Sequence, residues 1–273
     1  MCTIPPAPPP PPPAPFCPEV QSPSKSPSNP KPDTSTSKLK YLDVCEWATN
    51  RPELWEACAK HDVCHYQAPF YYKYTEFPSI LQVGPTCGLV ALSMIINNEV
   101  TPEEMLNIAK MEGYTNNGEM FSCKNMIELT KKVFNLAEIN VRFSLQCGGL
   151  FSKMTIERLL NGAALLVPYD ADFNHSPCLK RGHKAHWALV CGIIIVNDPG
   201  ENFDDIDNVY VLCKHGKSRY LAAWKLYDLE MSNKNLFEFS PQREGDGLMY
   251  ILPEGGVGGE NGLQDQFLMF EGF

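Results

Sequence analysis

The sequence predicts an α+β fold in which a helical N-terminal part packs on an antiparallel sheet. Segments with a helical spacing of apolar residues occupy the first half of the globular sequence. Two apolar runs typical of strands, HWALVCGIIIV and NVYVLCKHG, follow in the second half and are joined by the turn-rich segment NDPGENFDDID. Helices that precede a group of strands, rather than alternating with them, indicate an α+β domain.

The first expected elements are helices. Residues 41–74 are aromatic-rich and are expected to be helical, with Pro52 in a first turn. A buried helix is expected over residues 87–97, because apolar residues occupy most of its faces. The next helix is expected to begin after Thr101, which can form a capping box with Glu104.

The following elements lead into the sheet. The spacing of Met126, Leu129, Val133 and Leu136 predicts a helix in SCKNMIELTKKVFNL. The segment TIERLLNG predicts a short helix that ends at Gly162, and AALLVPYD predicts a buried strand.

Composition divides the chain into three parts. Residues 1–38 are rich in proline and poor in large apolar side chains, so they are expected to be disordered with polyproline II character. Residues 39–252 are expected to form one globular domain. Residues 253–273 are expected to be a flexible segment because of EGGVGGENG, and FLMFEGF within it either docks back on the domain or stays loose.

Charge and cysteine content limit the partners and the compartment. The formal net charge of −9 argues against nucleic acid or an anionic membrane as a partner. No signal peptide is visible, and no apolar run approaches the roughly 20 residues that cross a bilayer. The eleven cysteines are odd in number and scattered, which favours free thiols in the cytoplasm over a disulfide framework.

The segment QVGPTCGLVALSM predicts a nucleophilic cysteine. Cys87 follows a Gly-Pro turn and opens the apolar helix, where unpaired backbone N–H groups favour a thiolate. Gln82 lies on the approach to the turn, and its amide together with the Cys87 N–H can form an oxyanion hole. Of the six histidines, His186 is the best base, because it opens a strong apolar strand after a glycine-containing loop.

Each of these residues also has a structural interpretation. A single cysteine before an apolar helix is often a buried hydrophobic residue, and a histidine before a strand often has a packing role. The joint pattern of glutamine, turn, cysteine at a helix start and histidine at a strand start favours catalysis.

A third catalytic residue is less evident. Asp198 follows the strand that begins at His186, but a hairpin places it at the tip, up to ~40 Å of extended chain from His186. The residue opposite the start of one hairpin strand lies at the end of the other, so His215 is the favoured orienting group. The alternative is that His215 is a loop histidine that faces solvent.

No cofactor is expected. The segment CAKHDVCH contains Cys58, His61, Cys64 and His65, but four donors within one helix cannot all converge on a tetrahedral ion. No metal site is therefore predicted.

Order and motifs resemble papain-like cysteine peptidases, in particular the peptidase C39-like group, over roughly residues 75–230. A narrower resemblance is to the actin maturation protease family. It is carried by a proline-rich N-terminus followed by the segments QVGPTCGLVALSM, GHKAHWALVCG and HGKSRYLAAW. This resemblance implies that residues 39–252 are a peptidase C39-like catalytic domain. It also implies an aminopeptidase that removes the N-acetylated Met or Cys from immature actin.

Two expectations concern such a substrate. The segments CLKRGHK and KHGKSR supply Lys180, Arg181, Lys184, Lys214, Lys217 and Arg219, which would make a positive rim that suits an acidic residue beyond the scissile bond. The alternative is solvated loop lysines. Part of residues 41–80, or the loop YDADFNHSPC, is expected to close the non-primed side of the cleft.

The proline run PPAPPPPPPAPF preforms a rod that profilin, SH3, WW or EVH1 domains can bind. Its length favours profilin, and the family resemblance implies the same partner; the alternative is a flexible spacer. Two other functions remain open. One is a processing endopeptidase or deubiquitinase-like hydrolase on the same scaffold, and the other is a non-catalytic proline-rich adaptor.

Overall fold

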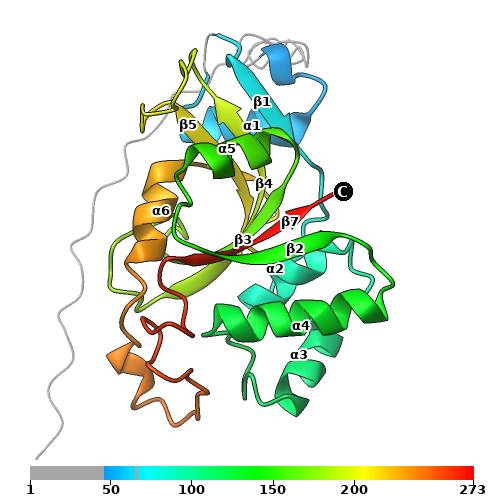
Figure 1. The fold of residues 1–273 in the computed structure, drawn as a ribbon, viewed down its shortest axis with the longest axis vertical. Helices are drawn as coiled ribbons and strands as arrows, with labels where there is room; N and C mark the ends of the chain where they lie inside the picture. The colour runs from blue at the N-terminus through cyan, green and yellow to red at the C-terminus, as the bar shows by residue number, and fades with distance from the viewer. Residues whose placement is uncertain (1–45, 65–66) are drawn as a thin grey trace, which may run out of the picture.

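The structure is a computed structural model and describes residues 46–64 and 67–273. The expectations for residues 1–38 lie outside the described residues. The α+β class that the sequence predicts is confirmed, because helices pack against an antiparallel sheet (Figure 1).

The helices are α1 (Pro52–His61), α2 (Cys87–Ile95), α3 (Pro102–Met111), α4 (Cys123–Leu136), α5 (Lys153–Leu160) and α6 (Leu226–Lys234), with the 3-10 helices η2 (Glu46–Ala48) and η3 (Pro241–Arg243). The strands are β1 (Tyr71–Tyr74), β2 (Arg142–Cys147), β3 (Ala164–Asp170), β4 (Ala185–Ile195), β5 (Val209–Lys214), β6 (Ala222–Lys225) and β7 (Gln266–Glu271). None of the helices in the described part of the chain is both long and apolar enough to cross a bilayer.

The sheet has the strand order β2-β7-β3-β4-β5-β6, and β1 pairs with the second half of β4. Apolar side chains cover both of its faces. One core joins the sheet to α1, α2, α3 and α4, and the other joins it to α5 and α6. Burial on both faces explains why β3 and β4 read as nearly continuous apolar runs rather than as alternating patterns.

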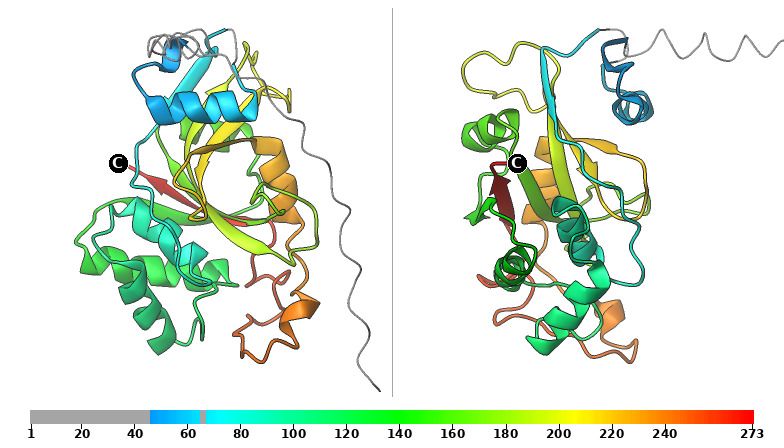
Figure 2. Two further views of the ribbon diagram at one scale, coloured as in Figure 1. Left: turned by 180° about the vertical axis from the view of Figure 1, so that it is seen from behind. Right: turned by 90° about the vertical axis from the view of Figure 1, so that its right-hand side faces the viewer.

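The expected helix starts are found where the sequence places them. Pro52 opens α1, and Cys87 is the first residue of α2. Thr101 caps α3: its hydroxyl accepts a hydrogen bond from the Glu104 N–H, and the Glu104 carboxylate accepts one from the Thr101 N–H at 2.8 Å. In Figures 1 and 2, α2, α3 and α4 lie together at the end of the molecule opposite α1 and β1.

One sequence expectation is wrong, and one of two open alternatives is found. Residues 71–74 form strand β1 rather than helix, because Tyr71–Tyr74 pair with the end of β4. FLMFEGF docks on the domain instead of staying loose, because residues 266–271 form the buried strand β7 between β2 and β3. No local sequence pattern predicts that the run FLMF pairs with β2 and β3. The wider division into domains stays a prediction.

This position of β7 makes the C-terminus essential for folding. Ending the chain at Asp265 removes the buried Phe267, Leu268 and Phe270 and leaves β2 without its only partner strand among the described residues. Each such side chain contributes roughly 2–5 kcal/mol, so their combined loss is comparable to the whole stability of a typical domain. We expect no cooperative thermal unfolding transition. Removing only Gly272 and Phe273 is the control and should leave a folded protein; cooperative unfolding of the shorter chain would contradict the role of β7.

Candidate active site

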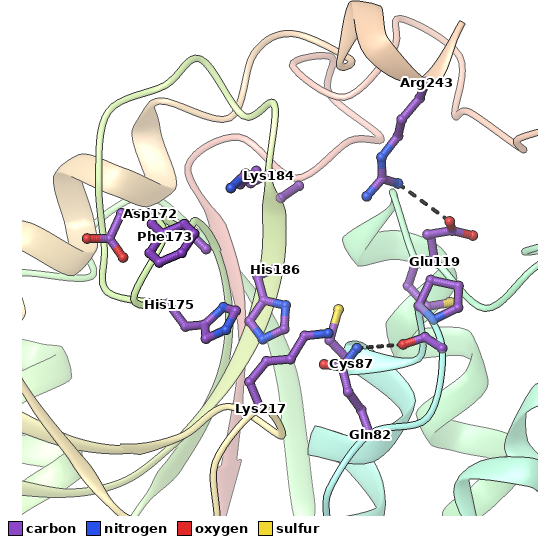
Figure 3. A pocket seen from close by; sticks show the side chains of 15 residues that line it. Gln82, Cys87, Glu119, Asp172, Phe173, His175, Lys184, His186, Lys217 and Arg243 are labelled. Atoms are coloured by element: carbon purple, nitrogen blue, oxygen red, sulfur yellow. Dashed lines mark hydrogen bonds and ion pairs between the residues drawn. The ribbon is translucent and has the colours of Figure 1, made fainter. Parts of the chain in front are cut away.

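A cavity of about 760 Å³ opens between the start of α2 and the start of β4. Its lining includes Gln82, Cys87 and His186, the three residues that the sequence singles out for catalysis. Figure 3 shows the three side chains gathered around one point of the cavity. The fold therefore brings together residues that lie far apart in the sequence.

Cys87 stands at the N-terminus of α2, but its thiol is protonated. Backbone N–H groups of Gly88 and Trp187 and the charges of Lys217 and Arg243 all lower the thiol pKa. Burial acts in the opposite direction and is the larger effect, so the pKa of Cys87 is raised above its ordinary value. The helix start that the sequence predicts for Cys87 is found, but burial opposes the groups that favour its thiolate.

Close packing of α2 on β4 places Cys87 beside the histidine strand. A Cβ atom at Gly88 would lie 2.6 Å from Met126 Cε and 3.1 Å from Trp187 Cδ1, so only glycine fits there without a shift. The Trp187 indole N–H donates to the Met120 carbonyl at 2.9 Å. These contacts explain the glycine after Cys87 and the tryptophan after His186.

His186 is buried in β4, and its ring is fixed by one hydrogen bond. Its Nε2 lies 2.7 Å from the backbone carbonyl oxygen of His215. A carbonyl can only accept, so Nε2 carries the hydrogen and Nδ1 is left with a free lone pair.

The histidine is neutral at physiological pH. Burial lowers the pKa of His186 to about 4, the His215 carbonyl opposes this shift, and the charge of Lys217 lowers the pKa further. The site therefore holds a neutral imidazole next to a neutral thiol.

The backbone carbonyl of His215, not its imidazole, is hydrogen-bonded to His186. The imidazole stacks on Trp224 with ring centroids 5.9 Å apart, and its buried Nδ1 has no hydrogen-bond partner among the described residues. Burial lowers the pKa of His215 to about 3. Asp198 is exposed beyond the end of β4, where its carboxylate accepts from the Gly200 N–H at 3.1 Å. The hairpin brings His215 to His186 as the sequence predicts, and the hydrogen bond is made by the His215 backbone carbonyl.

The segment His215–Gly216 also binds Gln82. The Gln82 N–H donates to the Gly216 carbonyl at 2.8 Å, next to the carbonyl that binds His186. The Gln82 side-chain Nε2 donates to the Gly84 carbonyl at 2.7 Å. An amide nitrogen has two hydrogens, so one remains available to a ligand in the cavity.

The loop YDADFNHSPC lies at the cavity. It contributes Ala171, Asp172, Phe173 and His175 to the lining, whereas none of the described residues 46–64 and 67–80 does. The loop is anchored by the Tyr169 hydroxyl, which donates to the His175 carbonyl at 2.8 Å.

Only part of the expected positive rim is present. Lys184 and Lys217 line the cavity, but Lys180, Arg181 and Arg219 do not. Lys214 is buried, and its ammonium group donates to the Phe77 carbonyl at 2.7 Å. The expectation is wrong for Lys214 because the last residue of β5 turns toward α1 instead of toward the cavity.

Sequence patterns miss three further lining residues: Glu119, Met120 and Arg243. Glu119 and Met120 precede α4, and Arg243 ends the 3-10 helix η3 near the C-terminus. None of them belongs to a periodic segment or a turn motif, so no local signal identifies them.

The segment CAKHDVCH does not bear on this cavity. Cys58, His61 and Cys64 lie at the end of α1 or just beyond it, and His65 lies outside the described residues. The expected absence of a metal site stays a prediction.

Comparisons with known proteins identify the family. A family model described as "Actin maturation protease-like, C-terminal domain" matches residues 77–194. The "Actin maturation protease" of Drosophila melanogaster is 43% identical over 230 residues, which are 84% of this chain and 82% of the relative. The protein of that name from Danio rerio is 38% identical and covers 70% of this chain and 71% of its own length. The Homo sapiens protein is 35% identical over 67% of this chain and 61% of its own length.

The chain belongs to the actin maturation protease family. The family assignment made from the sequence is thereby confirmed. The region matched by the actin maturation protease-like model contains Gln82, Cys87 and His186, and it ends before His215 and Arg243.

Two substitutions distinguish the role of the His215–Gly216 backbone from the role of the His215 imidazole. His215→Phe keeps the carbonyl and the ring stack on Trp224, so we expect kcat/KM for peptide cleavage to change less than about threefold. Gly216→Ala places a Cβ at a φ of +71° and 3.2 Å from Val90 Cγ1. We expect a loss of about 1–2 kcal/mol in stability and a 10- to 100-fold lower kcat/KM, because His186 and Gln82, which are hydrogen-bonded to this segment, both move. Equal losses in the two variants would show that the imidazole of His215 is required.

Proposed function

We propose that this protein is a cysteine-type aminopeptidase that removes the N-acetylated Met or Cys from immature actin. One observation carries the proposal: a thiol at a helix N-terminus shares a cavity with a histidine whose Nε2 is already bound, so that Nδ1 is free to act as a base. The relatives named actin maturation protease support actin as the substrate.

In the first step, Cys87 Sγ attacks the scissile carbonyl carbon while His186 Nδ1 takes the thiol proton. The proton then passes from Nδ1 to the departing amine, the C–N bond breaks, and a thioester of the N-acetylated residue remains on Cys87. Starting from a neutral pair, this sequence needs no separated charges in the free enzyme. Charge develops only once the substrate carbonyl is present.

The negative oxygen of the tetrahedral intermediate needs hydrogen-bond donors. As the first residue of α2, Cys87 has a backbone N–H without an intrahelical partner. The second hydrogen of Gln82 Nε2 supplies the other donor. Removing one such donor costs about 10²–10³ in kcat in comparable enzymes.

Water completes the reaction. His186 Nδ1 accepts a proton from the water as its oxygen attacks the thioester carbonyl, and that proton returns to Cys87 Sγ when the C–S bond breaks. The products are the free N-acetylated amino acid and a restored thiol. No metal or organic cofactor takes part in the proposed steps.

The direction of the bound substrate follows from the proton transfer. The leaving amine lies at His186, so the residue after the scissile bond lies on the His186 side of the cavity. Lys217 is close enough to His186 to lower its pKa, and Lys184 lines the same cavity. These ammonium groups suit an acidic residue at that position.

We propose further that the protein works in the cytoplasm and binds profilin through its proline-rich N-terminus. Free thiols at Cys87, Cys123, Cys178, Cys191 and Cys213 are consistent with a reducing compartment. A tail bound to profilin would raise the local concentration of profilin-carried actin near Cys87. A processing endopeptidase, a deubiquitinase-like hydrolase and a non-catalytic adaptor are the alternatives that the following assay separates.

The proposal is tested by the intact mass of actin bearing an acetyl-Met-Asp or acetyl-Cys-Asp N-terminus after incubation with purified protein, with and without profilin. We expect wild type to remove one acetylated residue and Cys87→Ala to remove none, because the nucleophile is lost. Cys178→Ala, which changes a half-buried thiol that does not line the cavity, is the matched control and should behave as wild type.

Unchanged actin with folded wild-type protein and profilin present would refute the actin assignment. Cleavage inside a longer unblocked peptide would favour the endopeptidase instead. Full activity of Cys87→Ala would refute the nucleophile.

The acidic limb of the pH–rate profile tests the state of His186. Its pKa is lowered to about 4, so the base stays unprotonated well below the ordinary histidine range. We expect kcat/KM on a short acetylated peptide to stay level from pH 8 to about 5 and to fall near pH 4. Stability at each pH is checked by returning samples to pH 7.5. A reversible fall centred near 6.5 would mean that His186 is not desolvated.

A further inference from the structure

Two charged side chains lie in the cavity on the opposite side of Cys87 from His186. Figure 3 shows Glu119 and Arg243 there, joined by an ion pair. Arg243 Nη1 lies 3.5 Å from Glu119 Oε1, which is too long for a good hydrogen bond. Glu119 Oε2 and Arg243 Nη1 are both buried and have no hydrogen-bond partner among the described residues. Buried polar atoms without partners are uncommon in folded proteins.

Arg243 is held by aromatic rings, and Glu119 is buried. The Arg243 guanidinium lies over the rings of Phe121 and Tyr250, 5.3 and 5.5 Å from their centroids. Glu119 is only 8% exposed, and the carbonyl of the next residue, Met120, accepts the hydrogen bond from Trp187. The unpaired acceptor and the unpaired donor therefore line one cavity, where a ligand can use both.

The acyl part of the substrate extends toward this pair. His186 must reach the leaving amine, so the residue that becomes attached to Cys87 points away from His186. Arg243 is close enough to Cys87 for its charge to lower the thiol pKa. Cys87, Glu119 and Arg243 line the same cavity, so a short acyl group attached to Cys87 shares that space with both charged side chains (Figure 3).

An acetylated amino group presents one hydrogen-bond acceptor and one donor: the acetyl carbonyl and the amide N–H. Resting on the proposed function, we propose that Glu119 and Arg243 form the subsite for this group. Arg243 Nη1 donates to the acetyl carbonyl, and Glu119 Oε2 accepts from the amide N–H. A free N-terminus has an ammonium group with donors only, so it leaves Arg243 unpaired and places a like charge beside it.

The test compares kcat/KM on three peptides with an actin-type sequence: acetyl-Met-Asp, free Met-Asp and acetyl-(N-methyl)Met-Asp N-termini. Wild type is expected to prefer the acetylated peptide and to lose about 10- to 100-fold when the N–H is methylated. Arg243→Met should lower kcat/KM by a similar factor on the acetylated peptide and by much less on the free one, so the preference for the acetylated peptide is lost. Arg243→Lys, which keeps a charged donor, should recover part of this preference.

Glu119 is tested by a double-substitution cycle. Glu119→Ala should be slower on the acetylated peptide, and methylation of the amide should then cost nothing further. The matched control is Arg158→Met, which breaks another arginine–glutamate pair, the 2.7 Å contact with Glu271, away from the cavity. It should keep the wild-type preference. Thermal unfolding and alkylation of Cys87 by iodoacetamide establish that each variant retains its fold and its thiol.

If Arg243→Met and Glu119→Ala lower kcat/KM by the same factor on the acetylated and the free peptide, the preference is kept. That result would overturn the inference while leaving the proposed function intact. A wild-type protein that cleaves the acetylated and free peptides equally well would also overturn the inference alone, whereas one that leaves the acetylated peptide uncleaved would count against the proposed function as well. If Arg243→Met does not fold, Arg243→Lys and the wild-type response to methylation decide the question.

Discussion

The candidate site depends on one hydrogen bond, from His186 Nε2 to the backbone carbonyl of His215 at 2.7 Å. This bond fixes the tautomer of the imidazole and leaves Nδ1 as the available base. A backbone carbonyl cannot be lost by substitution of a side chain, and it cannot titrate. The adjacent carbonyl, of Gly216, receives the N–H of Gln82 at 2.8 Å. A single turn after β5 therefore sets the position of both the base and the proposed oxyanion donor.

Burial is the second constraint. It raises the pKa of Cys87 and lowers that of His186, so both groups are neutral in the free protein. The surrounding charges do not reverse either shift. Positive charge is nevertheless present on both sides of Cys87, from Lys217 and Arg243, where it can stabilise negative charge that develops on a bound substrate. The low polarity of the site strengthens such interactions at the moment of reaction.

The sequence predicts those features that are encoded locally. The start of α2 at Cys87, the capping box of α3 and the hairpin that follows His186 all depend on neighbouring residues. Features that depend on distant contacts are missed. Strand β7 completes the sheet more than a hundred residues after β2, and Arg243 lies at the cavity against aromatic rings from distant parts of the chain. The choice of the His215 carbonyl over its imidazole is likewise set by the stack on Trp224, which no sequence pattern contains.

The hydrogen bond to the His215 carbonyl makes His186 a neutral imidazole with its hydrogen on Nε2. Nitrogen-15 NMR of the histidine-labelled protein, with His186 assigned by comparison with His186→Gln, reports the protonation of each ring nitrogen. We expect one protonated nitrogen, Nε2, and one unprotonated nitrogen, Nδ1, from pH 8 down to about 5. Two protonated nitrogens at pH 7, or a hydrogen on Nδ1 instead of Nε2, would contradict it.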